Sequence, residues 1–220
     1  MASQEGHTDI VRLILEREPN VDLCNKYSYS CLLTASQNGH TDIVRLLLER
    51  RANVDPCSHN RYSPLYMACQ NGHTDIVKLL LERNPKVDLC NIHGVTALNR
   101  ASYKGYTIIV NMLLHKHPNV DLCDKSGCSP LYMASQEGHT DVVMLLLERN
   151  PNVDLYDKGG CSPLYIASRH SHTDIVRLLL MRNANVDLCT NDRCSPLYIA
   201  SQNGHTDVVK LLLERNANVD

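Results

Sequence analysis

The strongest constraint on the fold of this chain is a 33-residue period that extends over its whole length. Gly39 follows Gly6 by 33 residues, and Gly72 follows Gly39 by the same interval. Glycine is followed by histidine at Gly6, Gly39, Gly72, Gly138 and Gly204. Gly105 and Ser171 occupy the two remaining positions of the series. A period of this length is typical of a solenoid, in which each unit buries its apolar face only against its neighbours.

Residues 124–156 show how a single unit is expected to fold. The segment Asp124–Gly127 has the composition of a tight turn, with aspartate first and glycine last. Ser129 is placed to cap a helix that begins at Pro130, where the missing N–H of proline costs nothing. Gly138 is expected to end this helix by adopting a left-handed backbone conformation.

A second helix is expected directly after the first. Thr140 and Asp141 begin it, and the carboxylate opposes the positive end of the helix dipole. The apolar residues expected to bury this helix are Val142, Val143, Leu145, Leu146 and Leu147. Asn150 is expected to adopt the left-handed conformation after it, and Pro151 prevents the helix from continuing. One unit is therefore a turn followed by two antiparallel helices.

These residues carry a family resemblance. The run Ser129–Ala134, then Gly138-His139, a leucine triplet and Asn-Val-Asp, resembles the ankyrin repeat. The resemblance covers essentially the whole chain, and it implies an all-α solenoid of helix-turn-helix units joined by short β-hairpin-like turns. Departures from the family pattern replace its histidine, its helix-ending glycine and its proline. They are Tyr66, Tyr132, Tyr165 and Tyr198 for histidine, Glu18, Arg51 and His117 for glycine, and Cys31 and Ala97 for proline.

We expect one ankyrin-repeat domain over residues 1–220. Its units are a partial one at 1–24, complete ones at 25–57, 58–90, 91–123, 124–156 and 157–189, and a last one at 190–220. The last unit keeps ordinary apolar residues, including Val208, Val209 and Leu212, where solenoids normally have polar capping repeats. We therefore expect that the chain is a segment of a longer array, or that another copy covers its ends.

The cysteines follow the repeat. Those before the turn are Cys24, Cys57, Cys90, Cys123 and Cys189, and those after it are Cys128, Cys161 and Cys194. A zinc site needs four converging donors, whereas equivalent residues of stacked helices lie about 8–10 Å apart. We therefore expect no metal and no cofactor. Free thiols are favoured, with disulfides Cys123–Cys128 and Cys189–Cys194 as the alternative. Ten cysteines without a consistent pairing favour a reducing, cytoplasmic location.

Charge and hydropathy argue against several functions. The net charge is −2 with acidic and basic residues interleaved, so neither nucleic acid nor an anionic membrane is an expected partner. Apolar runs such as Ile76–Leu81 are short and contain Lys78, so no segment is expected to span a bilayer. His-Thr-Asp could form a catalytic pair. It recurs in six units between the two helices, however, which favours helix initiation over enzyme activity.

Specificity is expected at the positions that differ between units. The resemblance implies that the turns and first helices line a concave face that binds a protein partner. On this face we expect the partner-binding residues to be Tyr27, Tyr29, Tyr62, Ile92, Val95, Tyr103, Lys104, Lys125, Lys158, Arg169 and His170. Tyrosine gives a large contact area at low entropic cost, and the basic residues favour an acidic partner. Alternatively, the tyrosines pack on their neighbours and the basic residues are a solvated fringe.

Two further alternatives remain open. Units 91–123 and 157–189 deviate most from the others, and the deviations reflect either function or drift after duplication. The near-identical units could also form a structural spacer, or an array that self-assembles end to end through its uncapped repeats. Such an array would be a homo-oligomer.

Overall fold

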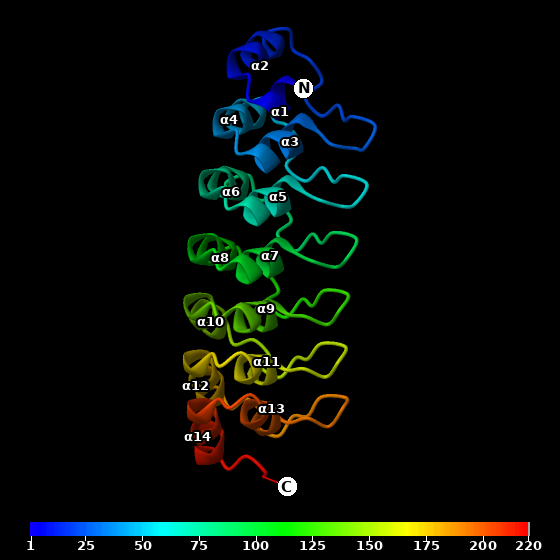
Figure 1. The fold of residues 1–220 in the computed structure, drawn as a ribbon. Helices are drawn as coiled ribbons and strands as arrows, with labels where there is room; N and C mark the ends of the chain where they lie inside the picture. The colour runs from blue at the N-terminus through cyan, green and yellow to red at the C-terminus, as the bar shows by residue number, and fades with distance from the viewer. Residues whose placement is uncertain (220) are drawn as a thin grey trace. The chain divides into compact units, whose positions relative to one another are not determined.

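The computed structural model describes residues 1–219, which form helical pairs joined by hairpin-shaped turns (Figure 1). Within this range the helices are α1 Ala2–Glu5, α2 Thr8–Leu15, α3 Cys31–Asn38, α4 Thr41–Glu49, α5 Pro64–Asn71, α6 Thr74–Leu81, α7 Ala97–Lys104, α8 Thr107–Leu114, α9 Pro130–Glu137, α10 Thr140–Leu147, α11 Pro163–Arg169, α12 Thr173–Met181, α13 Pro196–Gln202 and α14 Thr206–Glu214. The all-α repeat architecture is the one that the sequence predicts.

The expected helix boundaries are confirmed. The Ser129 hydroxyl accepts a hydrogen bond from the Tyr132 N–H at 3.1 Å, and Pro130 is the first residue of α9. Gly138 follows this helix with φ 77°. The same serine cap begins α3, α5, α11 and α13. Local sequence therefore determines where the first helix of these repeats begins.

Left-handed residues follow the second helices, as expected, even where glycine is replaced. Asn150 has φ 52°, and Glu18, Arg51 and His117 have φ of 52°, 59° and 52°. Ser171, which interrupts the glycine series after a first helix, has φ 60°. At each of these positions the left-handed backbone conformation costs about 1–2 kcal/mol, which a glycine would avoid.

Each turn is closed like a small hairpin. The Asp124 N–H donates to the Cys128 carbonyl at 3.1 Å. The Asp124 carboxylate accepts hydrogen bonds from the N–H groups of Ser126 and Cys128 at 2.8 and 2.9 Å. Isolated antiparallel bridges join Cys24 to Ser30 and Cys90 to Thr96. The expected β-hairpin-like turns are therefore present without extended strands in the described residues.

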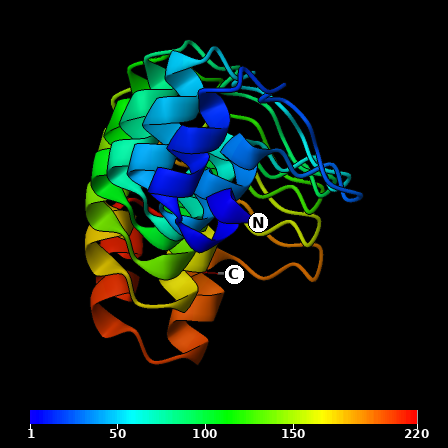
Figure 2. The same cartoon turned by 90° about the horizontal axis from the view of Figure 1, so that it is seen from above.

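The chain divides into two compact units. Unit 1 comprises residues 1–101 and 111–118, and unit 2 comprises the described residues 102–110 and 119–219, so α7 and α8 contribute to both. Within unit 1, α3 packs on α5 and α4 on α6. Within unit 2, α9, α11 and α13 pack in succession, as do α10, α12 and α14. In each unit the turns project from the first helices, on the side away from the second helices (Figures 1 and 2).

Neighbouring repeats are also joined by hydrogen bonds. Histidine Nε2 atoms donate to carbonyls of the preceding repeat in the pairs His40–Gln4, His73–Gln37, His139–Tyr103, His172–Gln136 and His205–Arg169, at 2.9–3.1 Å. None of these rings caps its own helix. Sequence reasoning correctly placed His-Thr-Asp at the start of the second helix but missed the role of its histidine, which joins two repeats.

Aspartates form a second series of inter-repeat bonds. The Asp154 carboxylate accepts a hydrogen bond from the Asn185 N–H at 2.9 Å. Equivalent bonds join Asp22 to Asn53 at 2.8 Å in unit 1 and Asp187 to Asn218 at 2.8 Å in unit 2. The core is mainly aliphatic. The residues expected to bury α10 do so except Leu145, which is half-exposed. The repeated residues thus act mainly as scaffold.

Candidate functional site

In unit 1, the expected binding residues Tyr29, Tyr62 and Val95 occupy the same position of three consecutive turns. They are half-buried and pack against a buried cluster formed by Leu33, Tyr66 and Met67. The Tyr62 and Tyr66 rings are stacked, with centroids 5.2 Å apart and an interplanar angle of 23°. These turn residues therefore contribute to packing while keeping part of their surface accessible.

Tyr27 and Ile92 lie at the tips of two turns in unit 1 and are more exposed. Their exposed fractions are 56% and 38%. The Lys26 ammonium lies 4.9 Å from the centroid of the Tyr27 ring, a distance suited to a cation–π contact. The His59 N–H donates to the Tyr27 carbonyl at 3.3 Å, and the Ile92 N–H donates to the Asn60 carbonyl at 3.1 Å. Backbone hydrogen bonds thus connect successive turn tips.

In unit 2, Lys125 and Lys158 lie at turn tips and are exposed. The Lys158 N–H donates to the Ser126 carbonyl at 2.8 Å, which repeats the connection between tips seen in unit 1. Within residues 1–219 neither tip ammonium group forms an ion pair or a hydrogen bond, so both are available to a ligand.

The other candidates in unit 2 lie at the ends of first helices. Tyr103 is half-buried, whereas Lys104, Arg169 and His170 are exposed. The scaffold uses the backbone carbonyls of Tyr103 and Arg169, which accept the histidine hydrogen bonds from the next repeat. The Lys104 ammonium lies 5.8 Å from the Tyr103 ring centroid. The inter-repeat hydrogen bonds use only the backbone carbonyls of Tyr103 and Arg169. The side chains at these two positions can therefore vary without loss of the bonds.

His170 has an unusual electrostatic environment. Its ring is stacked on His172, with centroids 5.9 Å apart. Partial burial, followed by the positive charges of His172 and Arg169, lowers the pKa of His170 below its ordinary value of 6.5. The side chain is therefore mainly neutral at pH 7, and it offers a partner one hydrogen-bond donor and one acceptor.

The cysteines do not form the two disulfides considered from the sequence. The Cys123 thiol donates to the Asp121 carbonyl at 3.5 Å, and the Cys189 thiol donates to the Asp187 carbonyl at 3.3 Å. Burial, followed by nearby aspartate carboxylates, raises the pKa of Cys128 to about 12 and that of Cys161 to about 11. Such thiols are protonated at neutral pH and are poor nucleophiles. Across residues 1–219, no group of three or more His, Cys, Asp and Glu side chains is placed to hold a metal ion.

Tyrosines at the family's histidine position have a role that the sequence analysis did not assign. The Tyr132 hydroxyl donates to Asp157 Oδ2 at 3.2 Å. The other oxygen of Asp157 accepts the N–H groups of Gly159 and Cys161, which shape the next turn. In unit 1, Asn91 Nδ2 donates to the Tyr66 hydroxyl at 3.3 Å. The sequence signal for this hydrogen bond is a tyrosine that lies 25 residues before the first polar residue of the following turn.

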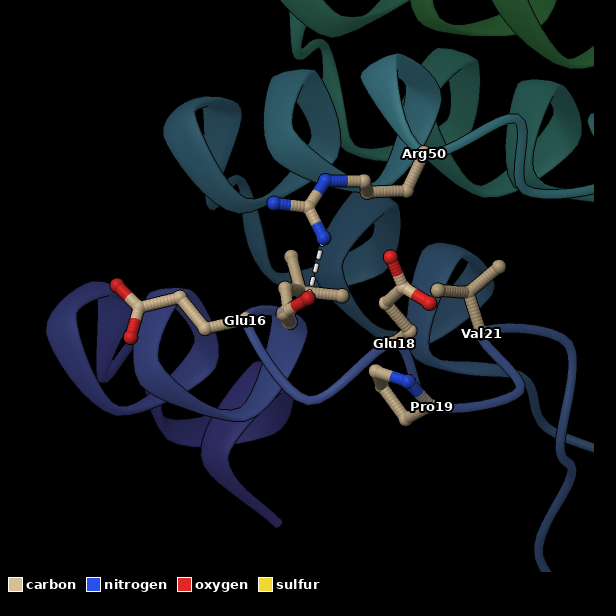
Figure 3. A pocket seen from close by; sticks show the side chains of 6 residues that line it. Glu16, Glu18, Pro19, Val21 and Arg50 are labelled. Atoms are coloured by element: carbon tan, nitrogen blue, oxygen red, sulfur yellow. Dashed lines mark hydrogen bonds between the residues drawn. The ribbon is translucent and has the colours of Figure 1, made fainter.

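A pocket of about 510 Å³ lies in unit 1, away from the turn tips (Figure 3). Its lining residues are Leu15, Glu16, Glu18, Pro19, Val21 and Arg50. The Arg50 guanidinium donates to the Leu15 carbonyl across this pocket. Arg182 makes the equivalent bond to the Leu147 carbonyl in unit 2. The recurrence of this contact shows that the pocket belongs to the junction between repeats.

The family is established by sequence comparison. A model of ankyrin repeats (three copies) matches residues 1–58, 52–124, 98–192 and 152–220, which together cover the chain. The protein therefore belongs to the ankyrin repeat family, whose members are general protein-interaction modules and are typically not enzymes. No helix within residues 1–219 is long and apolar enough to cross a membrane.

Solved structures agree with this assignment. The structure is similar to the crystal structure of the human ASB11 ankyrin repeat domain, with a TM-score of 0.83 and 27% sequence identity. The match covers 100% of this chain and 97% of the ASB11 chain. In all, 561 solved chains are similar to the structure, so the fold alone does not define a partner. A comparison with curated proteins finds no significant match.

Proposed function

We propose that this protein is a non-enzymatic binding module that holds a protein partner on the surface of its turns and first helices. The main support is the exposure of Tyr27 and Ile92 on turn tips that are connected by backbone hydrogen bonds. The stacking of the repeats does not require an exposed apolar side chain at Tyr27 or at Ile92. A large aromatic side chain on a rigid support is the usual form of a binding anchor, because little conformational entropy is lost on contact.

The partner-binding surface has one part in each unit. In unit 1 it consists of the exposed Tyr27 and Ile92 above the half-buried Tyr29, Tyr62 and Val95. In unit 2 it consists of Tyr103, Lys104, Lys125, Lys158, Arg169 and His170. The exposed ammonium and guanidinium groups favour a partner with acidic residues beside its apolar anchors. Free thiols such as those of Cys24 and Cys57 fit a reducing compartment, so we place this interaction in the cytoplasm.

The experiment is a quantitative comparison of proteins captured by the full chain and by two variants. Tyr27→Ala with Ile92→Ala removes the exposed anchors but leaves the packed Tyr29 and Tyr62. Arg45→Ala with Lys78→Ala removes exposed charges from α4 and α6 and serves as the matched control. Loss of an aromatic anchor costs about 2 kcal/mol or more, which corresponds to roughly 30-fold in affinity.

Proteins that bind the turn surface should be depleted with the first variant and retained with the control. Circular dichroism of both variants should match that of the parent chain. Retention of every captured protein by the Tyr27→Ala, Ile92→Ala variant would contradict the assignment.

A second candidate function, end-to-end stacking of identical chains, is favoured by exposure at both terminal repeats. Ile10 and Ile14 of α2 are exposed, whereas their counterparts Ile43 and Leu47 in α4 are buried. Because α2 packs against α4, we infer that Ile43 and Leu47 are buried by the preceding repeat. The first repeat therefore presents an apolar face of the kind that other repeats bury.

The last repeat presents the complementary face. Leu213 and Tyr198 are exposed, whereas their counterparts Leu180 and Tyr165 are buried. Both residues line a groove of about 470 Å³ at this end of unit 2, together with Val209. We propose that α1 and α2 of one copy occupy the groove on α13 and α14 of another, which is a heterologous contact able to produce dimers or fibres.

A further inference from the structure

The outward positions of the second helices carry a repeated charge pattern. Aspartate occupies the first turn at Asp9, Asp42, Asp75, Asp141, Asp174 and Asp207. A basic residue follows three positions later at Arg12, Arg45, Lys78, Arg177 and Lys210. Glutamate lies seven positions after the aspartate at Glu16, Glu49, Glu82, Glu148 and Glu214. All of these side chains are exposed, as expected of a solvated face.

Three consecutive repeats place an apolar residue in this pattern, each at a different position, and the repeat of α8 also has Asn111 and His115 at the other two positions. Ile108 replaces the aspartate in α8, Met144 replaces the basic residue in α10, and Met181 replaces the glutamate in α12. Their exposed fractions are 67%, 49% and 59%. Stacking does not account for these apolar residues, because they face solvent and their counterparts are charged.

The three replacements advance along the helices in regular steps. Ile108 is at the first-turn position of α8, Met144 is three positions further along in α10, and Met181 is seven positions further along in α12. Offsets of three and seven residues remain on one face of a helix. Each replacement therefore lies about one helical turn further along than the one in the preceding repeat, and together they form a diagonal.

The elements that carry the diagonal are neighbours within unit 2. Thr107 and the segment Thr140–Val142 line one pocket, which places the start of α8 beside the start of α10. The helices α10 and α12 pack against each other. Leu145 and Leu178 are half-buried and lie four residues after Asp141 and Asp174, which places them on the same helix faces as Met144 and Met181. We call Ile108, Met144, Leu145, Leu178 and Met181 the outer patch.

The surroundings of the outer patch limit the chemistry of a ligand. Helix α8 contains no charged residue, and α10 contains only Asp141. Asp141 and Asp174 form an acidic edge at the starts of their helices. The opposite edge is mixed, because the exposed Glu148 stands beside Arg149 and the Arg182 guanidinium donates to the Leu147 carbonyl. A ligand on the outer patch is therefore apolar along its centre and basic on the side that faces the starts of α10 and α12.

We propose that the outer patch binds an amphipathic helix of a partner protein. Such helices bind through apolar side chains at positions i, i+3 or i+4, and i+7, which suits a narrow apolar stripe crossing three helices. Methionine adapts its unbranched side chain to helical ligands. Five partly exposed side chains offer less than the roughly 800 Å² per partner of a stable interface between folded proteins, which disfavours a second copy of this chain.

This surface is separate from the proposed turn surface. Within unit 2 the second helices lie on one side of the first helices and the turns on the other (Figures 1 and 2). A helix on the outer patch therefore leaves the turns accessible, so failure of one proposal does not decide the other.

The test uses a displayed library of 18-residue helical peptides with a fixed apolar stripe and randomised flanks, selected on the full chain. Affinities of the selected peptides are then measured by fluorescence anisotropy for three proteins. The first is the parent chain. The second carries Met144→Arg and Met181→Glu, which introduce the residues found at equivalent positions, Arg177 and Glu148. The third carries Lys210→Ala in α14 as a surface control.

The proposal predicts selected peptides with basic residues on the flank that faces Asp141 and Asp174. Their affinity should fall at least 30-fold for the double variant and remain within twofold for Lys210→Ala. Equal binding to the parent and the double variant, or no selected peptide at all, would overturn the proposal. Sedimentation showing a parent dimer that dissociates in the double variant would also overturn it, in favour of a second copy.

Discussion

At the scale of single residues, Gly138 is needed for two separate reasons. Its φ is 77°, and a Cβ at this position would lie 2.6 Å from Cε1 of His172. Gly204 has a similar φ of 73°, but within residues 1–219 no neighbouring atom would lie within 4 Å of a Cβ added there. The two glycines thus share the backbone requirement and differ in the neighbouring ring.

We therefore expect Gly138→Ala to reduce the free energy of unfolding more than Gly204→Ala. Displacing the His172 ring breaks its 3.1 Å hydrogen bond to the Gln136 carbonyl, which adds about 1 kcal/mol to the shared backbone strain. Urea titrations followed by circular dichroism measure both values. Equal losses would show that the histidine contact contributes nothing to stacking.

His170 predicts a pH dependence of stability. Its pKa is lowered by partial burial and by His172 and Arg169, partly offset by Glu137, so the folded state binds the proton less readily than the unfolded state. The contribution of neutral His170 to the free energy of unfolding is fully present above pH 6.5. It is lost as the pH falls through the lower pKa that His170 has in the folded state. His170→Asn, which introduces the residue of Asn203, removes this dependence.

The measurement is the melting temperature of the parent chain and of His170→Asn between pH 7.5 and pH 5. The parent should lose more stability than the variant on acidification. Parallel melting curves for the two proteins across this range would contradict the assignment.

Residue-scale features were predictable from sequence where their cause is local. Ser129, Pro130 and Gly138 act on their own helix, so their types alone indicate its ends. His172 was assigned only to helix initiation because its bonding partner, Gln136, lies 36 residues earlier. The spacing of such pairs becomes informative only when the stacking geometry of successive repeats is known.

At the scale of structural elements, Tyr132 joins the first helix of one repeat to the turn of the next. Burial and the Asp157 carboxylate raise the pKa of its hydroxyl, which therefore remains a donor at neutral pH. We expect Tyr132→Phe to lower the free energy of unfolding by about 1–2 kcal/mol, since a hydrogen bond to a charged acceptor is lost.

Tyr165→Phe is the matched control for this change. Tyr165 occupies the equivalent position and is also buried, but its hydroxyl has no hydrogen-bond partner within residues 1–219. Its replacement should change stability by less than about 0.5 kcal/mol. Thermal unfolding compares the two variants, and similar losses would exclude a specific role for the Asp157 contact.

Element order followed from the sequence because the 33-residue period repeats the same helix signals. The packing of Tyr29 and Tyr62 was one of two alternatives that the sequence left open, and that of Val95 was not predicted, because tyrosine and valine at one position suggest only a site tolerant of size. Their shared contact with Leu33, Tyr66 and Met67 depends on how one turn lies on the next. The partner-binding role of the eleven candidate residues, and the single-domain organisation of residues 1–220, stay predictions.

At the scale of the whole molecule, exposed end faces predict association that depends on concentration. Ile10→Glu with Ile14→Glu places charges on the face proposed to enter the groove beside Leu213. Sedimentation velocity should show oligomers of the parent chain that the double variant lacks. Leu13→Glu is the control, because Leu13 is exposed at a position that other repeats leave partly exposed. A parent chain that remains monomeric at every concentration would exclude stacking.

The central claim is that the repeated residues hold the scaffold while the exposed turn tips bind a protein. The most direct measurement is hydrogen–deuterium exchange of the full chain, alone and with a captured protein whose retention depends on Tyr27 and Ile92. If this claim is correct, exchange should be slower in the turns around Tyr27, Asn60 and Ile92 and unchanged in α4 and α6. Slower exchange in α4 and α6, with no change in these turns, would contradict it.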